Sequence, residues 1–143
     1  MNVAAILRTK GRQVITIAPH AKVATATALL RRHGIGALVV SADGAAVLGI
    51  LSERDIVHAL ADQASKALEL EVAQLMSHPV VTCKPDDGIA ELMSLMTERR
   101  IRHLPVIERG ALAGIVSIGD VVKNRLDEVE SEASSMREFI AGA

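Results

Sequence analysis

Two short motifs in this chain place a hydroxyl three residues before a carboxylate, where a run of strand-forming residues gives way to a helical pattern. They are Ser52-x-x-Asp55 and Ser117-x-x-Asp120. A strand that ends at a helix start presents free backbone N–H groups and a favourable helix dipole to an anion. The serine can reach a phosphate, and the aspartate can accept two hydrogen bonds from a ribose diol. The alternative is a capping box within the helix, and a serine can fill both roles.

Positive charge gathers at residues 99–103, where Arg99, Arg100, Arg102 and His103 stand almost side by side. A guanidinium can clamp a phosphate through two hydrogen bonds, and a histidine can add a donor. Arg99 and Arg100 suit the end of a helix, where positive charge complements the helix dipole. We therefore assign these two to a helix terminus and treat Arg102 and His103 as candidates for an anionic ligand.

Both Ser-x-x-Asp motifs belong to an internal repeat. Residues 14–19 align with residues 80–85 at an offset of 66, and residues 49–52 align with residues 114–117 at an offset of 65. Hydrophobic periodicity and turn residues predict the order strand, helix, strand, strand, helix in each copy. Two units, each too small to close a core alone, are expected to bury their apolar faces against each other. The sequence therefore predicts an α+β fold of two βαββα repeats.

The bounds of the predicted elements follow from runs of β-branched residues and from apolar residues at helical spacing. In the first copy we expect strands at 14–17, 37–40 and 47–51 and a second helix at 54–61. In the second copy we expect a strand from 80, strands at 103–107 and 112–116, and a helix that starts near 118. A polar, alanine-rich connector joins the two copies.

The end of the chain predicts a long amphipathic helix. Its apolar residues recur at alternating steps of four and three and form a heptad seam, namely Val122, Leu126, Val129, Ala133, Met136 and Ile140. Glutamates and Arg137 lie off the seam, so the opposite face is solvated. The stripe either packs on its own domain or pairs with a partner chain. A coiled coil this short is only marginally stable by itself.

Composition excludes several classes of function. The chain has 143 residues, 16 basic and 17 acidic side chains and a net charge of −1, so no overall field favours nucleic acid or an anionic membrane. Phe139 is the only aromatic residue, which excludes an aromatic platform for stacking nucleobases. A bound base would have to rest on aliphatic side chains.

The reactive residue types are sparse. Cys83 is the only cysteine, so no intrachain disulfide or multi-cysteine zinc site can form, and the pattern suits a reducing compartment. The other histidines stand singly without ligand neighbours, so we expect no metal site. No nucleophile and base stand out, and we expect no catalytic residues. Without a long apolar run or an apolar N-terminal stretch, we expect a cytoplasmic protein.

Taken together, in order and in duplicate, three motifs resemble a tandem pair of CBS domains, also called a Bateman module. The first is the lead-in from Leu75-Met76-Ser77 to Val80-Val81-Thr82, and the second is the segment Arg-His-Leu-Pro-Val-Ile at 102–107. The third is Gly-Ile-x-Ser-x-x-Asp, found at 49–55 and again at 114–120. The resemblance covers about residues 3–126.

The resemblance implies a pseudo-twofold pair of βαββα repeats with two clefts that bind adenosine-containing ligands such as AMP, ADP, ATP, S-adenosylmethionine or NAD. Such modules regulate and are not catalysts, and many pair as disc-shaped dimers. Accordingly, we expect CBS domain 1 at 3–61, a connector at 62–72, CBS domain 2 at 73–126 and a C-terminal amphipathic helix at 127–143. The family habit and the heptad seam together predict a homodimer.

The resemblance also assigns residues to the two clefts. Arg102 and His103 match positions that meet phosphates. Arg54 matches one that can lean across the pseudo-twofold toward the phosphate of the neighbouring cleft, and the alternative is an exposed residue of the first helical turn. The second, stronger cleft is expected to hold Thr82, Val80, Cys83, Pro85, Ile101, Arg102, His103, Ile115, Ser117, Asp120 and Arg54. The first cleft is expected to hold Val14, Thr16, Ile17, Pro19, Ile35, Ile50, Ser52 and Asp55. It is expected to be weaker because Gly36 and Ala37 replace Arg102 and His103 there.

These observations predict a stand-alone CBS-pair sensor that binds an adenine nucleotide of the AMP, ADP or ATP class, or NAD, without a required cofactor. Its partners would be that ligand, a second copy of the chain and an unidentified regulated protein, and neither nucleic acid nor a membrane. The alternative is a structural dimerisation module with vestigial clefts. A nucleotide-processing enzyme is disfavoured because no nucleophile or general base stands out.

Overall fold

The computed structural model describes residues 1–142, and its first repeat is a small sheet covered by helices. The repeat contains β1 (Thr16–Ile17), α2 (Val23–His33), β2 (Ala37–Val40), β3 (Gly49–Ser52) and α3 (Glu53–Gln63). β1 pairs with β2 in parallel, and β2 pairs with β3 in antiparallel orientation. All four residues of β2 are buried because this strand lies at the centre of the sheet.

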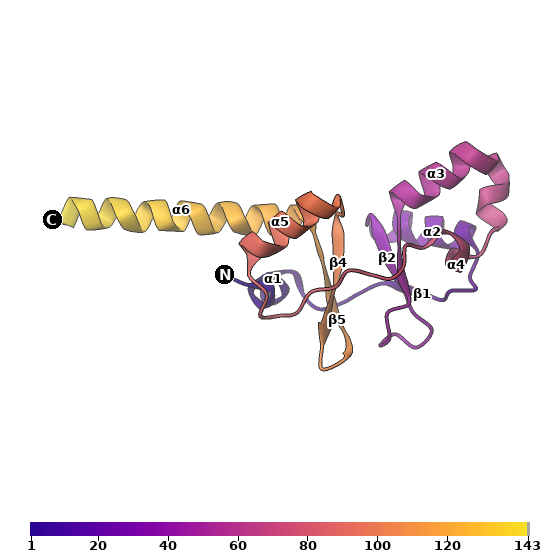
Figure 1. Ribbon diagram of the computed structural model, residues 1–143, viewed down its shortest axis with the longest axis horizontal. Coiled ribbons are helices and arrows are strands. Elements are labelled where there is room, and N and C mark those ends of the chain that lie inside the picture. Colours follow the sequence, from indigo (N-terminus) through magenta and orange to yellow (C-terminus); the bar gives the residue numbers. More distant parts are fainter. Residues whose placement is uncertain (143) are drawn as a thin grey trace.

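The second repeat repeats this plan with one strand fewer. It contains α5 (Ile89–Arg99), β4 (His103–Glu108), β5 (Ala111–Ser117) and the first turns of α6 (Ile118–Gly142). β4 and β5 form an antiparallel hairpin. Figure 1 shows the two repeats side by side, with α6 projecting away from both.

The strand expected from residue 80 is absent from the described second repeat, and this prediction was wrong. In the first repeat the N–H of Val39 donates to the carbonyl of Ile15. Pro105 occupies the equivalent position in the second repeat and has no N–H to donate to Val81. The pairing is therefore reduced to a single parallel bridge between Cys83 and Val106.

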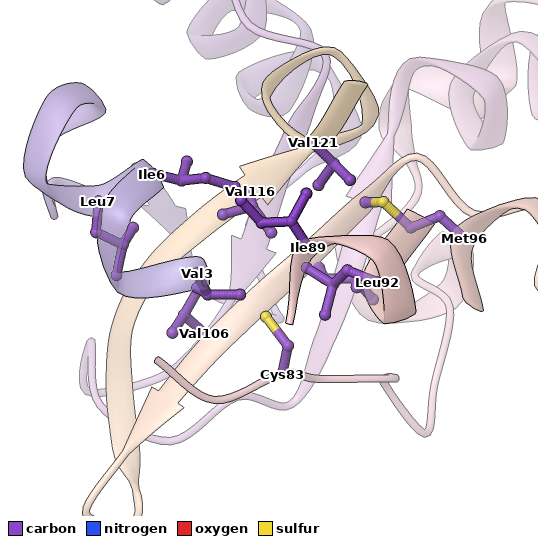
Figure 2. Close-up of a cluster of buried hydrophobic side chains, with 11 residues drawn as sticks. Val3, Ile6, Leu7, Cys83, Ile89, Leu92, Met96, Val106, Val116 and Val121 are labelled. Atoms are coloured by element: carbon purple, nitrogen blue, oxygen red, sulfur yellow. The ribbon is translucent and has the colours of Figure 1, made fainter. Parts of the chain in front are cut away.

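Each repeat completes its core with a segment from outside its own βαββα unit. Helix α1 (Val3–Lys10) lies at the start of the chain but packs into the core of the second repeat through Val3, Ile6 and Leu7 (Figure 2). The short helix α4 (Val72–Leu75) precedes the second repeat but packs into the core of the first. Each core therefore contains a helix that lies next to the other repeat in the sequence.

Two glycines of the duplicated motif make this exchange possible. A Cβ at Gly114 would lie 2.7 Å from a methyl carbon of Leu7, and a Cβ at Gly49 would lie 2.5 Å from the sulfur of Met76. Real Cβ contacts are not this short, so glycine lets the exchanged segment pack closely, above all at Gly114, where Leu7 is held in the core. The glycine of each motif thus lies under a segment from outside its own βαββα unit.

The connector is ordered and packed. It forms the 3₁₀ helix η1 (Ala64–Glu69), in which Ala67 is fully buried, and Leu68 and Leu70 pack against the first core. None of the described helices combines the length and hydropathy that a bilayer span requires.

Helix α6 is attached to the protein only through its first turns. Val121 is its one buried residue, whereas Leu126, Met136, Phe139 and Ile140 are each more than 60% exposed. The apolar stripe therefore does not pack on its own domain.

Candidate functional site: the cleft between the repeats

A cleft of about 420 Å³ lies where the two repeats meet. Small-molecule sites in proteins usually have volumes of roughly 300–1,000 Å³. Residues from both repeats line it, namely Gly36, Ile50, Ser52, Glu53, Arg54, Asp55, Val57, Ser77, Arg100, Ile101, Arg102 and His103.

The first repeat contributes the end of β3 and the start of α3. Ser52 is the N-cap of α3, and its hydroxyl accepts a hydrogen bond from the Asp55 N–H at 3.3 Å. The Asp55 carboxylate accepts from the Ser52 N–H at 2.8 Å and from the Ser52 hydroxyl at 3.0 Å. The capping box is therefore present, and the same two side chains line the cleft. Over residues 1–142, the Asp55 carboxylate forms no ion pair and accepts hydrogen bonds only from Ser52.

The second repeat contributes Ile101, Arg102 and His103 at the start of β4. Gly36 of the first repeat lies beside the histidine, and a Cβ there would meet the imidazole Nε2 at an ordinary 3.4 Å and Glu53 Oε1 at 2.8 Å. Gly36, the counterpart of Arg102 in the first repeat, thus lines the cleft next to a side chain of the other repeat.

Arg54 crosses the boundary between the repeats. Its Nη1 donates to the carbonyl of Arg100 at 3.4 Å, and the guanidinium lies on the cleft lining. Arg100 follows α5 as its C-cap in the left-handed conformation, with φ of 55°. The assignment of Arg99 and Arg100 to a helix terminus is confirmed, but Arg100 also lines the cleft, which the sequence did not indicate.

Burial lowers the pKa of His103, and the positive charges of Lys10 and Arg102 lower it further. The carboxylates of Glu53 and Asp120 act in the opposite direction without cancelling the shift. The imidazole is therefore neutral at neutral pH, with one nitrogen as a donor and the other as an acceptor.

The second Ser-x-x-Asp motif carries an additional charge. Asp120 accepts from the Ser117 N–H at 2.9 Å and donates its own N–H to the Ser117 hydroxyl at 3.2 Å, as in the first motif. In addition, Lys10 Nζ lies 2.6 Å from Asp120 Oδ2. Burial raises the pKa of Asp120, but the hydrogen bonds from Lys10 and Ser117 and the charge of Lys10 outweigh it, so the pKa lies below 3.8.

The structure regroups the residues expected in the two clefts. Arg54, Ile101, Arg102 and His103 were expected beside Asp120, but they line one cleft with Ile50, Ser52 and Asp55. The reason is that the start of β4 lies at the boundary, next to the N-terminus of α3 from the other repeat. The remaining polar or partly exposed residues lie outside this lining, namely Thr82, Val80, Pro85, Ile115, Ser117, Asp120, Val14, Thr16, Pro19 and Ile35.

Two residues expected in the cleft walls belong to the cores instead. Cys83 is 2% exposed and Ile17 is 5% exposed, each within the apolar cluster of its repeat. Burial raises the pKa of the Cys83 thiol to about 12. Neither side chain can contact a ligand in the cleft, so their assignment to the walls is corrected.

Several residues of the cleft and its surroundings were not found from the sequence. Glu53 and Ser77 line the cleft, and Lys10 pairs with Asp120. Each acts across a boundary between segments distant in the chain. The one signal for this boundary in the sequence is the alignment of the two repeats, which places Gly36 opposite Arg102.

Comparisons with known proteins agree with the fold. The family model for the CBS domain matches this chain twice, at residues 3–62 and 72–127. The mitochondrial CBS domain-containing protein CBSX3 of Arabidopsis thaliana is 35% identical over 117 residues, which cover 79% of this chain and 57% of CBSX3. The chain thus spans little more than half the length of that relative.

Two solved structures share the architecture. The CBS-domain protein ATU1752 of Agrobacterium tumefaciens is 47% identical with a TM-score of 0.84, and the match covers 87% of this chain and 99% of ATU1752. The CBS domain pair of protein MJ0100, solved with 5′-methylthioadenosine and S-adenosyl-L-methionine, has a TM-score of 0.78 at 22% identity, over 90% of this chain and 98% of that one. The second likeness concerns the fold alone. The chain belongs to the CBS-domain family and carries two CBS domains in tandem.

Proposed function

We propose that this chain is a non-catalytic regulatory protein that binds an adenosine-containing nucleotide in the cleft between its repeats. The observation that carries this proposal is the position of Asp55. Its carboxylate has no cation partner over residues 1–142, and it lies on the same lining as Arg54, Arg102 and His103. An acceptor for a ribose diol thus stands in one cleft with donors for a phosphate.

Each part of a nucleotide finds suitable chemistry in this cleft. Ile50, Val57 and Ile101 offer aliphatic surface for a base in a chain without a suitable aromatic residue. The first turn of α3, an 11-residue helix, lies on the lining, where the helix dipole favours an anion. Arg54 and Arg102 carry charge suited to one or two phosphate groups. These features favour AMP, ADP, ATP or NAD over an uncharged nucleoside.

The fold itself supports the adenosine class. The CBS pair of MJ0100 was solved with two adenosine compounds, and we extend that class to this chain as part of the proposal. Binding would favour one packing of the two repeats and so change the surface offered to a regulated protein.

Calorimetric titration of the full chain with adenine nucleotides tests the proposal. Asp55→Asn keeps an acceptor for the Ser52 N–H but loses the negative charge that a ribose diol prefers. It should weaken binding on the order of tenfold to a hundredfold, as expected for the loss of a charge-assisted hydrogen bond. Asp62→Asn, an exposed carboxylate at the end of the same helix, is the matched control.

A structural module with vestigial clefts is the second candidate, and the exposed seam of α6 favours it. The two candidates differ in ligand response. A ligand at a hundred times its dissociation constant stabilises the folded state by roughly 2.7 kcal/mol. If no adenosine compound raises the melting temperature at millimolar concentration, the structural module is the better account. If the Asp55→Asn and Asp62→Asn variants bind the nucleotide with equal affinity, Asp55 does not contact the ligand.

A further inference from the structure

From Leu126 onward, the apolar seam of α6 is largely exposed over the described residues. In heptad notation the d positions are Val122, Val129 and Met136, and the a positions are Leu126, Ala133 and Ile140. The exposed fractions of Leu126, Met136 and Ile140 are 63%, 61% and 66%. This part of the helix extends beyond both repeats (Figure 1), so no described surface of its own chain covers it.

The seam stays accessible while α6 is docked on its own repeat. The helix faces the repeat through Val121, which is fully buried, and through Arg125 and Glu128, which pair with each other. Glu128 also lies 3.3 Å from the N-terminal amine of Met1. The seam runs beside this docked face rather than on it. Because the first turns are already folded and packed, a partner helix does not have to nucleate α6.

The apolar residues alone do not select an orientation for a second copy. Their spacing is symmetric about residue 131, so an antiparallel partner also aligns the seam, with Leu126 opposite the partner's Met136 and Val129 opposite the partner's Ala133. The choice depends on the charged residues that flank the seam, at the e and g positions.

A parallel, in-register pair places opposite charges together. The g residues Arg125 and Glu132 then face the partner's Glu130 and the partner's Arg137, which occupy e positions of the next heptad. Both contacts occur twice by symmetry. Glu130, Glu132 and Arg137 are exposed and form no ion pair within the described part of the chain, whereas Arg125 is half-buried and already pairs with Glu128.

An antiparallel pair with the same seam places like charges together. Lys123 would face the partner's Arg137, Glu130 would face the partner's Glu130, and Glu132 would face the partner's Glu132. Like charges across a helix pair are destabilising.

We propose that α6 pairs with α6 of a second copy as a parallel, in-register coiled coil. The charge pattern at residues 123–137 selects this occupant and this orientation. The two CBS pairs then lie at the same end of the coiled coil, related by a twofold axis along it. This inference does not depend on nucleotide binding in the cleft.

Charge exchange between two flanking positions tests the orientation in the full chain. Glu132→Arg and Arg137→Glu each convert attraction into repulsion, and each should weaken the dimer on the order of tenfold by sedimentation analysis. The double variant, and an equimolar mixture of the two single variants, should restore dimers because opposite charges face each other again. Glu138→Arg, a reversal of the same size away from the seam, is the control.

Three other outcomes would contradict a parallel pairing of α6. An antiparallel dimer would be tightened by Arg137→Glu, which would face the partner's Lys123, and would not respond to Glu132→Arg. A dimer that ignores both variants would use another surface. A wild-type chain that stays monomeric at the highest concentrations would mean that a different protein covers the seam.

Disulfide trapping gives an independent reading of the register. With Met136→Cys, a parallel pair brings the two introduced thiols face to face at a d layer, and mild oxidation should link the chains. The native Cys83 does not interfere because it is buried in the core. Ser131→Cys, on the opposite face of α6, should not be linked. If Met136→Cys is not linked but a mixture of Leu126→Cys and Met136→Cys is, the helices are antiparallel and the proposal fails.

Discussion

Lys10 Nζ lies 2.6 Å from Asp120 Oδ2, so the end of α1 neutralises the carboxylate of the second Ser-x-x-Asp motif. Asp55, the equivalent of Asp120, forms no ion pair over residues 1–142. The two motifs have the same capping box and the same backbone position, yet only one of them offers an unneutralised carboxylate. The charge of the two motifs therefore differs because of Lys10, a residue that belongs to neither motif.

Removing this ammonium group should make Asp120 available to a ribose diol. Lys10→Gln is expected to raise the affinity of the second Ser-x-x-Asp motif for adenosine by up to about fivefold, which corresponds to the energy of a partly exposed ion pair. Calorimetric titration with adenosine measures the change, and Lys66→Gln on the exposed side of η1 is the control. An affinity that falls in Lys10→Gln would mean that Lys10 binds the ligand itself.

The lowered pKa of His103 should make stability depend on pH. Above 6.5 both the folded and the unfolded states hold a neutral imidazole, and below 6.5 the unfolded state binds a proton first. Wild type should therefore lose stability relative to His103→Gln as the pH falls from 7.5 toward 5. Urea unfolding across this range measures the loss, and each pKa unit of lowering corresponds to about 1.4 kcal/mol.

His58→Gln, on the exposed side of α3, is the control for the histidine experiment. Parallel stability profiles for wild type and His103→Gln would show that the environment of His103 does not disfavour its charged form.

The glycine of the second motif should resist even the smallest side chain. Gly114→Ala places a Cβ 2.7 Å from Leu7, which is buried in the core, so the free energy of unfolding should fall by about 1–3 kcal/mol. Gly119→Ala is the matched change, because its Cβ meets only the Ser117 hydroxyl at an ordinary 3.6 Å within α6. It should raise stability by about 0.5–1 kcal/mol. Equal denaturation midpoints for the two variants would contradict the close packing of α1 on β5.

The Cys83 thiol should be inert in the native protein. Its side chain is buried and its pKa is raised to about 12, so the thiolate is scarce at pH 8. A thiol-specific chromogenic reagent is expected to label the protein only after unfolding in denaturant. Rapid labelling of the folded chain would show that the region between α1 and β4 opens readily.

The sequence determined the local elements because their signals are local. The strand predicted at 37–40 is β2 with the same bounds, and the helix expected near residue 118 begins at Ile118. Both Ser-x-x-Asp motifs form the capping boxes that their spacing indicates. The sequence even contained the reason for the missing strand, since Pro105 cannot donate a hydrogen bond, but this follows only once the pairing partner of that residue is known.

Only the tertiary structure decided which repeat each segment completes. Val3 and Leu7 are close to the first repeat in the chain but lie in the core of the second, and Arg102 and His103 line a cleft with Ser52 and Asp55 rather than with the motif of their own repeat. Helical and strand periodicities state which face of an element is apolar, and they carry no information about the surface that will cover it. The two repeats offer apolar surfaces of the same kind, so the choice between them depends on close contacts between residues far apart in the chain, such as Leu7 on Gly114.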